Sequence, residues 1–113
     1  PRMTALREYI ARQSWSTEYE VVPSNPYLLE LTAKGANKGG MVRRLAQMLE
    51  IRQENVYCVG DHANDIPMLT FARTAFAPAN AIQAVHEVPG IHILPNCWEN
   101  AIAAMIAELD KRY

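Results

Sequence analysis

The feature that most constrains the fold is a regular alternation of short apolar runs with helical patterns after residue 37. Three runs have the composition of short buried strands, at residues 55–59, 74–77 and 91–94. Helical spacing fills the stretches around them, at residues 38–49 and 66–72 and after Asn80 and Asn96. Strands that alternate with helices need crossover connections, which favour a parallel sheet covered by helices. The sequence therefore predicts an α/β fold with three layers and a mostly parallel sheet.

The N-terminal third has a different pattern. Residues 3–13 carry apolar groups at helical spacing, and residues 18–22 and 27–32 resemble two strands joined by turn-forming residues. We expect a helix followed by a β-hairpin. The change of pattern near residue 33 is the candidate boundary, and it divides the chain into units at residues 1–33 and 34–113.

Composition narrows the class of protein. A chain of 113 residues, half of them hydrophobic, is long enough for one domain with a core. The formal net charge of −1 does not suggest a polyanion-binding surface, and no apolar run approaches the roughly 20 residues that span a bilayer. We therefore expect neither nucleic acid nor a membrane as a partner.

Cys58 and Cys97 fit buried, reduced thiols in a cytoplasmic protein, with a disulfide as the alternative. Because the chain opens on Pro1 with a helical pattern under way, we expect a piece of a longer protein.

Two carboxylates follow the first apolar run. The stretch G-D-H-A-N-D-I-P-M-L, residues 60–69, places Asp61 and Asp65 four positions apart at the end of a strand. In open α/β sheets, ligands bind beyond the carboxyl ends of the strands. Carboxylate oxygens suit a hard cation, and Mg²⁺ takes one or two protein carboxylates together with water and phosphate oxygens. The alternative is a solvated loop in which Asp65 only caps the following helix.

A lysine opens the preceding helix. Lys38 stands between Asn37, which can cap that helix, and Gly39 and Gly40. A lysine at this position opposes the helix dipole, so a compensating anion would stabilise it. A phosphate held together with nearby carboxylates would provide that anion; the alternative is a solvated surface amine. Glycines form helices poorly, so their presence here indicates close approach of another group to the backbone.

Each helix is expected to bury one apolar face. For the helix 38–49 this face is Met41, Val42, Leu45, Met48 and Leu49. For the final helix it is Trp98, Ala101, Ile102, Met105, Ile106 and Leu109. Capping boxes are expected at Asn80 with Gln83 and at Asn96 with Glu99.

Three strings taken together resemble one family. K-G-x-N-K-G-G-x-V-x-x-L-A is followed by V-Y-C-V-G-D-x-x-N-D-I-P-M-L and then by F-A-x-A-N-A. These strings are similar to the C-terminal part of haloacid dehalogenase-superfamily phosphatases, and most of all to the Cof-type branch, which carries an α/β cap between the halves of its core. The resemblance covers about residues 27–110. It implies half of a haloacid dehalogenase-like core at residues 34–113, preceded by the tail of the cap at residues 1–33.

The resemblance also implies roles for four residues. Asp61 and Asp65 would bind Mg²⁺ directly or through water, and Asn64 would contact the phosphate of the substrate. Lys38 would neutralise that phosphate and the nucleophilic carboxylate, so that Lys38 and Asp61 are the implied catalytic residues of this chain. The implied reaction is hydrolysis of a phosphate ester through an aspartyl-phosphate. The implied substrate is a small phosphorylated metabolite such as a sugar phosphate.

One part of the family pattern does not occur in the sequence. The first motif, D-x-D-x-[TV], which supplies the nucleophile, has no counterpart among the 113 residues. We therefore expect the isolated chain to be inactive, and its partner to be the missing N-terminal half of the core or a second copy. A non-catalytic α/β binding or interaction module is the alternative. A phospho-accepting receiver domain is disfavoured because its lysine follows its acids, whereas Lys38 precedes Asp61.

Overall fold

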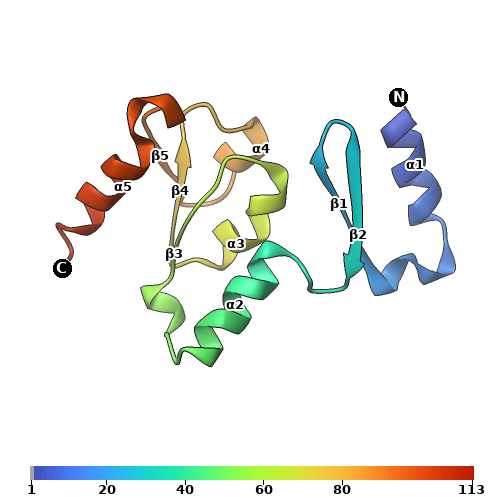
Figure 1. Cartoon of the computed structure of the whole chain (residues 1–113), viewed down its shortest axis with the longest axis horizontal. Helices are drawn as coiled ribbons and strands as arrows, with labels where there is room; N and C mark the ends of the chain where they lie inside the picture. Colours follow the sequence, from blue (N-terminus) through green and yellow to red (C-terminus); the bar gives the residue numbers. More distant parts are fainter. Residues whose placement is uncertain (1) are drawn as a thin grey trace.

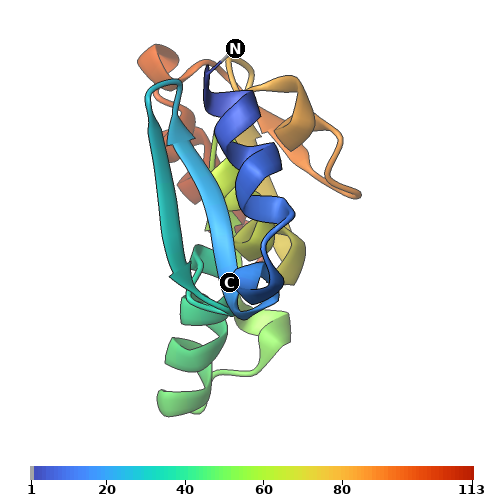
Figure 2. The same ribbon diagram turned by 90° about the vertical axis from the view of Figure 1, so that its right-hand side faces the viewer.

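The computed structural model describes residues 2–113 and has two parts (Figure 1). The first part contains α1 (Arg2–Ala11), a 3₁₀ turn at Ser14–Glu18, and an antiparallel hairpin of β1 (Tyr19–Asn25) and β2 (Leu28–Ala33). Helix α1 lies across one face of this hairpin (Figure 2). The helix and hairpin that the sequence predicts are therefore present, with β1 longer than expected.

The second part is an α/β unit. Its elements are α2 (Lys38–Met48), β3 (Tyr57–Val59), α3 (Ile66–Phe71), β4 (Thr74–Pro78), α4 (Gln83–His86), β5 (His92–Leu94) and α5 (Ala101–Leu109). The three strands lie in the order β3-β4-β5, and both neighbouring pairs are parallel. The predicted alternation and the parallel sheet are thus confirmed.

Alternate residues of the strands face two different helical layers, as strand geometry requires. Cys58, Ala75 and Ala77 pack on the side of α2, α3 and α4, where Leu69 and Val85 belong to the same cluster. On the other side, Phe76 and Leu94 pack against Ala101 at the start of α5. The sheet is therefore the middle of three layers, and the carboxyl end of β3 emerges between them.

The face that α2 buries differs from the predicted one. Ala46 and Gly39 are buried, whereas Leu45, Leu49 and Met48 are exposed, Met48 to 72%. A Cβ at Gly39 would collide with the backbone carbonyl of Pro67 in α3. Helix α2 thus approaches α3 through its smallest residues. This contact explains why residue 39 is a glycine, and it leaves Leu45, Met48 and Leu49 on the outside.

The end of the chain also departs from the prediction. Trp98 lies before α5 and is 71% exposed, and Ile102 and Ile106 on α5 are 54% and 53% exposed. The other half of the predicted face is confirmed, because the helix packs through Ala101 and the partly buried Met105 and Leu109. Half of the predicted apolar face therefore remains uncovered in this chain.

Only one of the two predicted capping boxes forms. The Asn96–Glu99 box is present, although it opens a 3₁₀ turn rather than α5 directly. Asn80 does not cap α4; its side chain accepts a hydrogen bond from the backbone N–H of Cys97 at 2.9 Å. Asn80 ties the end of β4 to the turn before α5, because a tertiary partner competes with the local one.

In the strand order β3-β4-β5 the two edge strands are β3 and β5, and β3 is the one that leads into the loop with Asp61 and Asp65. Val56 accepts from the backbone N–H of Arg73 at 2.9 Å, and the N–H of Gly60 donates to the carbonyl of Phe76 at 3.2 Å. Since backbone groups of successive residues alternate in direction, those of Tyr57 and Val59 face away from β4. Grooves of about 210 and 220 Å³ adjoin β3, one beside α2 and one beside α5.

Two further findings concern the cysteines and the length of the helices. Both cysteines are free; Cys58 is buried as predicted, but Cys97 is exposed, so the prediction of a second buried thiol was wrong. Among residues 2–113, no helix has the length and apolar character that crossing a membrane requires.

Candidate active site

The candidate site is built on the loop that follows β3. Its backbone turns at Gly60, where a Cβ would lie 2.5 Å from the Cβ of Asp65. No residue with a side chain fits at this position unless Asp65 moves. The loop then passes through Asp61 and His62 into a 3₁₀ turn at Ala63–Asp65, which continues as α3. Gly60 therefore allows Asp65 to fold back against the end of β3.

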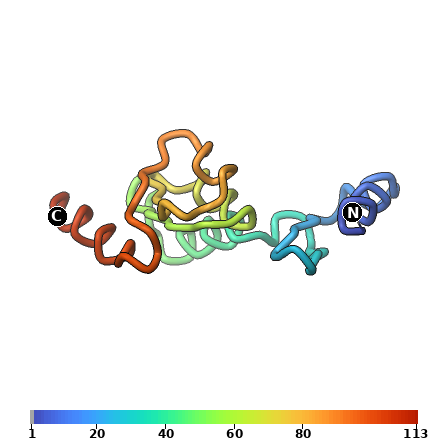
Figure 3. The backbone as a smooth tube through the Cα atoms, turned by 90° about the horizontal axis from the view of Figure 1, so that it is seen from above, coloured from blue at the N-terminus to red at the C-terminus, as the bar shows by residue number. Residues whose placement is uncertain are grey.

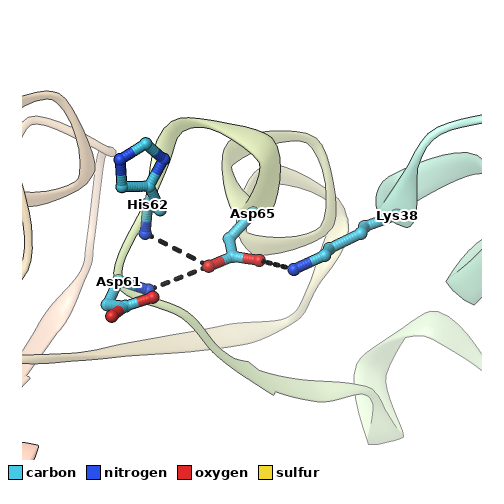
Figure 4. Close-up of polar contacts among 4 residues, drawn as sticks. All are labelled: Lys38, Asp61, His62 and Asp65. Atoms are coloured by element: carbon cyan, nitrogen blue, oxygen red, sulfur yellow. Dashed lines mark hydrogen bonds and ion pairs between the residues drawn. The ribbon is translucent and has the colours of Figure 1, made fainter. Parts of the chain in front are cut away.

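Asp65 anchors this loop. Its side chain is only 5% exposed, and its Oδ2 accepts hydrogen bonds from the backbone N–H groups of Asp61 at 2.9 Å and His62 at 3.2 Å (Figure 4). Its Oδ1 accepts from the ammonium of Lys38. A buried carboxylate is stable only with such partners. Asp65 thus does more than cap a helix, because it joins the loop to α2.

The charge state of Asp65 follows from these contacts. Burial by itself would raise the pKa of its carboxyl group, but the hydrogen bonds from Lys38, Asp61 and His62 outweigh it and lower the pKa below the usual value. Asp65 is therefore ionised at neutral pH and keeps the ion pair with Lys38.

Lys38 reaches the loop from the first residue of α2. The side chain of Asn37 accepts from the N–H of Gly40 at 2.8 Å, so the predicted N-cap is confirmed. A Cβ at Gly40 would collide with the carbonyl of Gly35. The Lys38 side chain is 49% exposed, and an ammonium has three N–H donors. One donor serves Asp65, so the remaining donors can bind an anion.

Asp61 lies on the other side of Asp65 from Lys38. Figure 4 shows that its backbone nitrogen, and not its carboxylate, points to Asp65. Asp61 is exposed and lines the groove of about 220 Å³ beside α5, together with Pro78 and Cys97. The loop therefore holds the Asp61 carboxylate at the carboxyl end of β3, available to a ligand.

Asn64 shares a pocket with Lys38. This cavity of about 250 Å³, called the hairpin pocket below, lies between the hairpin and the start of α2. Its lining includes Val22, Glu30, Thr32, Lys38, Met41 and Asn64. The structure thus brings together three of the four residues singled out in the sequence, Lys38, Asn64 and Asp65, with Asp61 on the far side of the same loop.

One carboxylate of this site is available to a divalent cation. Residues 2–113 contain no group of three or more His, Cys, Asp or Glu side chains that could enclose a metal ion. Mg²⁺, however, binds through one or two carboxylates and completes its shell with water and phosphate oxygens. The exposed Asp61 carboxylate fits that requirement, whereas both oxygens of Asp65 already accept hydrogen bonds.

Sequence reasoning missed the hairpin's contribution to the site. Glu30 and Thr32 lie two residues apart on β2, so their side chains emerge on one face of the hairpin. In the sequence, the signal for this contribution was the two-residue spacing of these polar side chains. Only the packing of β1 near the 3₁₀ turn at Ala63–Asp65 shows that this face looks toward Lys38.

The α/β fold, with Asp61, Asp65 and Lys38 at the carboxyl end of β3, defines a class of protein. A family model for haloacid dehalogenase-like hydrolases matches residues 2–106, and the chain belongs to that family.

Two Bacillus subtilis proteins illustrate the relationship. The protein YxeH is 40% identical over 92 residues, which cover 81% of this chain and 34% of YxeH. The 5-amino-6-(5-phospho-D-ribitylamino)uracil phosphatase YcsE is 36% identical over 70 residues, covering 62% of this chain and 28% of YcsE. The chain therefore spans about a third of the length of the curated relatives that it matches.

A solved structure agrees with this assignment. A haloacid dehalogenase-like hydrolase from B. subtilis superposes with a TM-score of 0.84 at 27% identity, covering 96% of this chain and 36% of that one. The fold class predicted from the sequence is thus confirmed.

Proposed function

We propose that this chain supplies the lysine and metal-binding part of a Mg²⁺-dependent phosphatase of the Cof type. The observation that carries the proposal is the ion pair of Lys38 with Asp65, in the loop that presents Asp61 at the carboxyl end of β3. A lysine ammonium paired with the loop that presents an exposed carboxylate suits a bound phosphate with its counterion. Phosphatases among its relatives support the reaction type.

Each residue has a distinct role in this proposal. Lys38 and Asn64 bind the phosphate oxygens, and Lys38 offsets the charge that develops during transfer. Asp61 holds the metal ion. Asp65 is a positioning residue, because it fixes the Lys38 ammonium and the Asp61 backbone at the same time.

The proposed metal, Mg²⁺, would supply charge neutralisation at the phosphate. The nucleophilic aspartate, on which the phosphate ester would form an aspartyl-phosphate, belongs to the part of the relatives that lies outside this sequence. The carboxylate would bond to phosphorus as the bond to the ester oxygen breaks, and that oxygen would leave with its carbon chain and take up a proton. Water would then hydrolyse the aspartyl-phosphate, which releases phosphate and restores the carboxylate.

The open edge of β3 suggests where the remainder of the core binds. The backbone groups of Tyr57 and Val59 are free to pair with another parallel strand, and apolar side chains flank them on both faces. We propose that an N-terminal core segment, or a second copy of this chain in its place, covers this edge. A strand there would end beside Asp61, where a nucleophile is needed.

A cytoplasmic location is part of the same proposal. It is supported by the two free thiols, because disulfides are rare in reducing compartments.

A cation titration tests the metal site. With Mg²⁺ added, we expect weak binding that shifts the amide signals of residues 60–65, and we expect Asp61→Asn to abolish the shifts. Asp65→Ala should abolish them too, because the loop loses its anchor. Asp110→Asn, at an exposed position, is the matched control and should bind like the wild type. The alternative function, a non-catalytic interaction module, predicts no Mg²⁺ binding by the wild type or by any of these variants.

A hydrolysis assay tests the reaction. With p-nitrophenyl phosphate and Mg²⁺, we expect no turnover by this chain alone. Turnover that Asp61→Asn abolishes would show that the nucleophile is present after all. A hybrid in which this chain replaces the matching segment of YxeH should hydrolyse the ester if parental YxeH does. In the hybrid, Lys38→Ala should lower kcat/KM by about 10²-fold or more, whereas the neighbouring Lys34→Ala should not. Equal rates for the two lysine variants would contradict the proposal.

A further inference from the structure

Helices α2 and α3 lie side by side (Figure 1), and a cavity of about 560 Å³ opens between them. This cavity, called the interhelical pocket below, has a lining that includes Arg43, Ala46, Gln47, Gln53, Thr70 and Phe71. Its volume is in the range of about 300–1,000 Å³ that is typical of small-molecule pockets. Of the described residues in its lining, none belongs to the loop 60–65, and Lys38 is not among them. The interhelical pocket is therefore separate from the candidate active site.

The pocket also lies apart from the sheet edge that we expect another segment to cover. Arg43 and Gln47 are one turn apart and share a side of α2. Leu45 and Leu49 lie on a different side of α2 and line the groove of about 210 Å³ beside β3. The two cavities have in common Ala46 and Ile51. A strand that pairs with β3 would cover the side of the leucines and leave Arg43 and Gln47 accessible.

Arg43 is held over an aromatic ring in this pocket. Its guanidinium carbon lies 5.0 Å from the centre of the Phe71 ring, which is a cation–π contact. Among residues 2–113, no carboxylate forms an ion pair with Arg43. A guanidinium has five N–H donors in a planar fork, and the contact with the ring leaves donors available. Arg43 is thus positioned in advance to bind an anion.

Gln53 holds the far wall of the pocket. Its side-chain Nε2 donates to the backbone carbonyl of Phe71 at 2.7 Å. This bond joins the end of α3 to the turn that follows α2, and it leaves the side-chain oxygen of Gln53 as an acceptor. The Gln47 amide and the Thr70 hydroxyl belong to the same lining. The pocket therefore places uncharged hydrogen-bonding groups beside one cation.

Charge and chemistry of the lining select a class of ligand. Of the described residues that line the pocket, Arg43 is the only charged one. One positive charge matches one negative charge, and the edge of a guanidinium matches the two oxygens of a carboxylate. Ala46, Ile51 and Pro67 add apolar surface to the same lining. A monocarboxylate attached to an apolar body satisfies both requirements.

We propose that the interhelical pocket is a second binding site, for a small monocarboxylate with an apolar body of about the size of one ring. Arg43 pairs with the carboxylate, and the apolar body lies against Ala46 and Pro67 between the two helices. The inference uses neither the phosphate site nor the metal site, so it can fail or hold independently of the proposed function.

The experiment compares three probes on this chain by NMR. Benzoate carries both the charge and the ring, benzamide replaces the carboxylate by a neutral group of the same shape, and acetate keeps the charge without the ring. Benzoate should shift the amide signals of Thr70 and Phe71 and the side-chain Nε signal of Arg43. It should bind about ten-fold more tightly than benzamide, which lacks the charged hydrogen bonds, and also more tightly than acetate, which lacks the apolar contact.

Two neighbouring arginines separate a local contact from net charge. Arg43→Gln removes the guanidinium and keeps a polar side chain, so this variant should bind benzoate no more tightly than it binds benzamide. Arg44→Gln makes the same change of charge at the next exposed position, outside the lining, and should bind benzoate like the wild type. Unchanged amide spectra away from α2 and α3 will show that both variants fold.

The outcomes decide between this site and its alternatives. Equal affinity of Arg43→Gln and the wild type for benzoate would overturn the proposal, and so would equal affinity of the wild type for benzoate and acetate. Shifts centred on Lys38 and Asn64 would place benzoate in the proposed phosphate site and remove the second site. A chain that binds benzoate at Arg43 but binds no Mg²⁺ would retain this inference and lose the proposed function.

Discussion

At the scale of single residues, Asp65 decides the structure of the site. The sequence suggested a carboxylate that caps a helix or holds a cation. In the structure, its two oxygens instead join the backbone of the following loop to the ammonium of Lys38. Its buried charge is therefore a structural requirement of the loop that carries Asp61.

The first prediction concerns the stability that Asp65 contributes. Asp65→Ala leaves two backbone N–H groups without their acceptor, so we expect a loss of about 1–3 kcal/mol in the free energy of unfolding at pH 7. Asp65→Asn retains one acceptor oxygen and should lose less. Urea unfolding followed by circular dichroism measures both. A smaller loss for the alanine variant than for the asparagine variant would contradict the assignment.

The same contacts predict a pH dependence. Because the folded-state pKa of Asp65 is lowered, its contribution is fully present above the unfolded value of about 4 and is lost as the pH falls through the folded value. The wild type should therefore lose stability below about pH 4 more steeply than Asp65→Asn does. Thermal unfolding from pH 6 to pH 2 measures the difference, and parallel curves would rule out the contribution.

The second prediction concerns Gly60. A Cβ there would lie 2.5 Å from the Cβ of Asp65, so Gly60→Ala should displace the Asp65 side chain and break its bond to Lys38. We expect a loss of stability and large shifts of the Lys38 signals by NMR. Gly90→Ala is the control: it strains a backbone with φ of +74° but meets no atom within 4 Å. It should destabilise the chain without disturbing Lys38.

At the scale of elements, a small residue sets the position of α2. Helix α2 touches α3 through Gly39, while the large apolar residues Leu45, Met48 and Leu49 face outward. Hydrophobic periodicity identified the helix correctly but not its contact face, because glycine contributes nothing to such a pattern. This close approach holds Lys38 at the distance that its bond to Asp65 requires.

The third prediction tests that contact. Alanine is the better helix former by about 1 kcal/mol, so Gly39→Ala would stabilise an isolated helix. In the protein we expect the opposite sign, since the new methyl group collides with the carbonyl of Pro67. Met48→Ala in the exposed part of the same helix should have almost no effect. Denaturant unfolding of both variants is the measurement, and a stabilised Gly39→Ala would refute the packing argument.

At the scale of the whole molecule, the chain is extended and incompletely covered. Its radius of gyration is 15.9 Å, against about 13 Å for a compact domain of this length. The hairpin and α1 project from one end of the core, and α5 lies at the other (Figure 3). Apolar side chains flank the open edge of β3 on both faces. This surface favours association with a further segment or a second copy.

The fourth prediction follows from that surface. We expect the chain to self-associate with increasing concentration in sedimentation velocity. Leu49→Lys combined with Ile106→Lys should weaken the association, because each places a charge on an exposed apolar side. The melting temperature should stay close to that of the wild type. Gln47→Lys, exposed on α2, is the control for charge alone. A monomer at all concentrations, or equal association of the double variant and the wild type, would contradict this prediction.

The sequence by itself determined the features whose signals are local. Apolar runs alternating with helical patterns gave the parallel α/β sheet, and the strings around Lys38 and Asp61 gave the family. The N-cap at Asn37 was also predictable, since a cap depends on a few neighbouring residues. The glycines beside Lys38 predicted a close approach to the backbone, but not which group approaches.

Only the tertiary structure decided the rest. Lys38 and Asp65 lie 27 residues apart, and their bond depends on how closely α2 packs on α3. Asn80 binds Cys97 instead of capping α4, and the apolar sides of α2 and α5 remain exposed. The hairpin pocket exists because β1 and β2 turn one face toward Lys38. Periodicity tells which residues share a face of an element, but which neighbour covers that face is set by packing between segments distant in sequence.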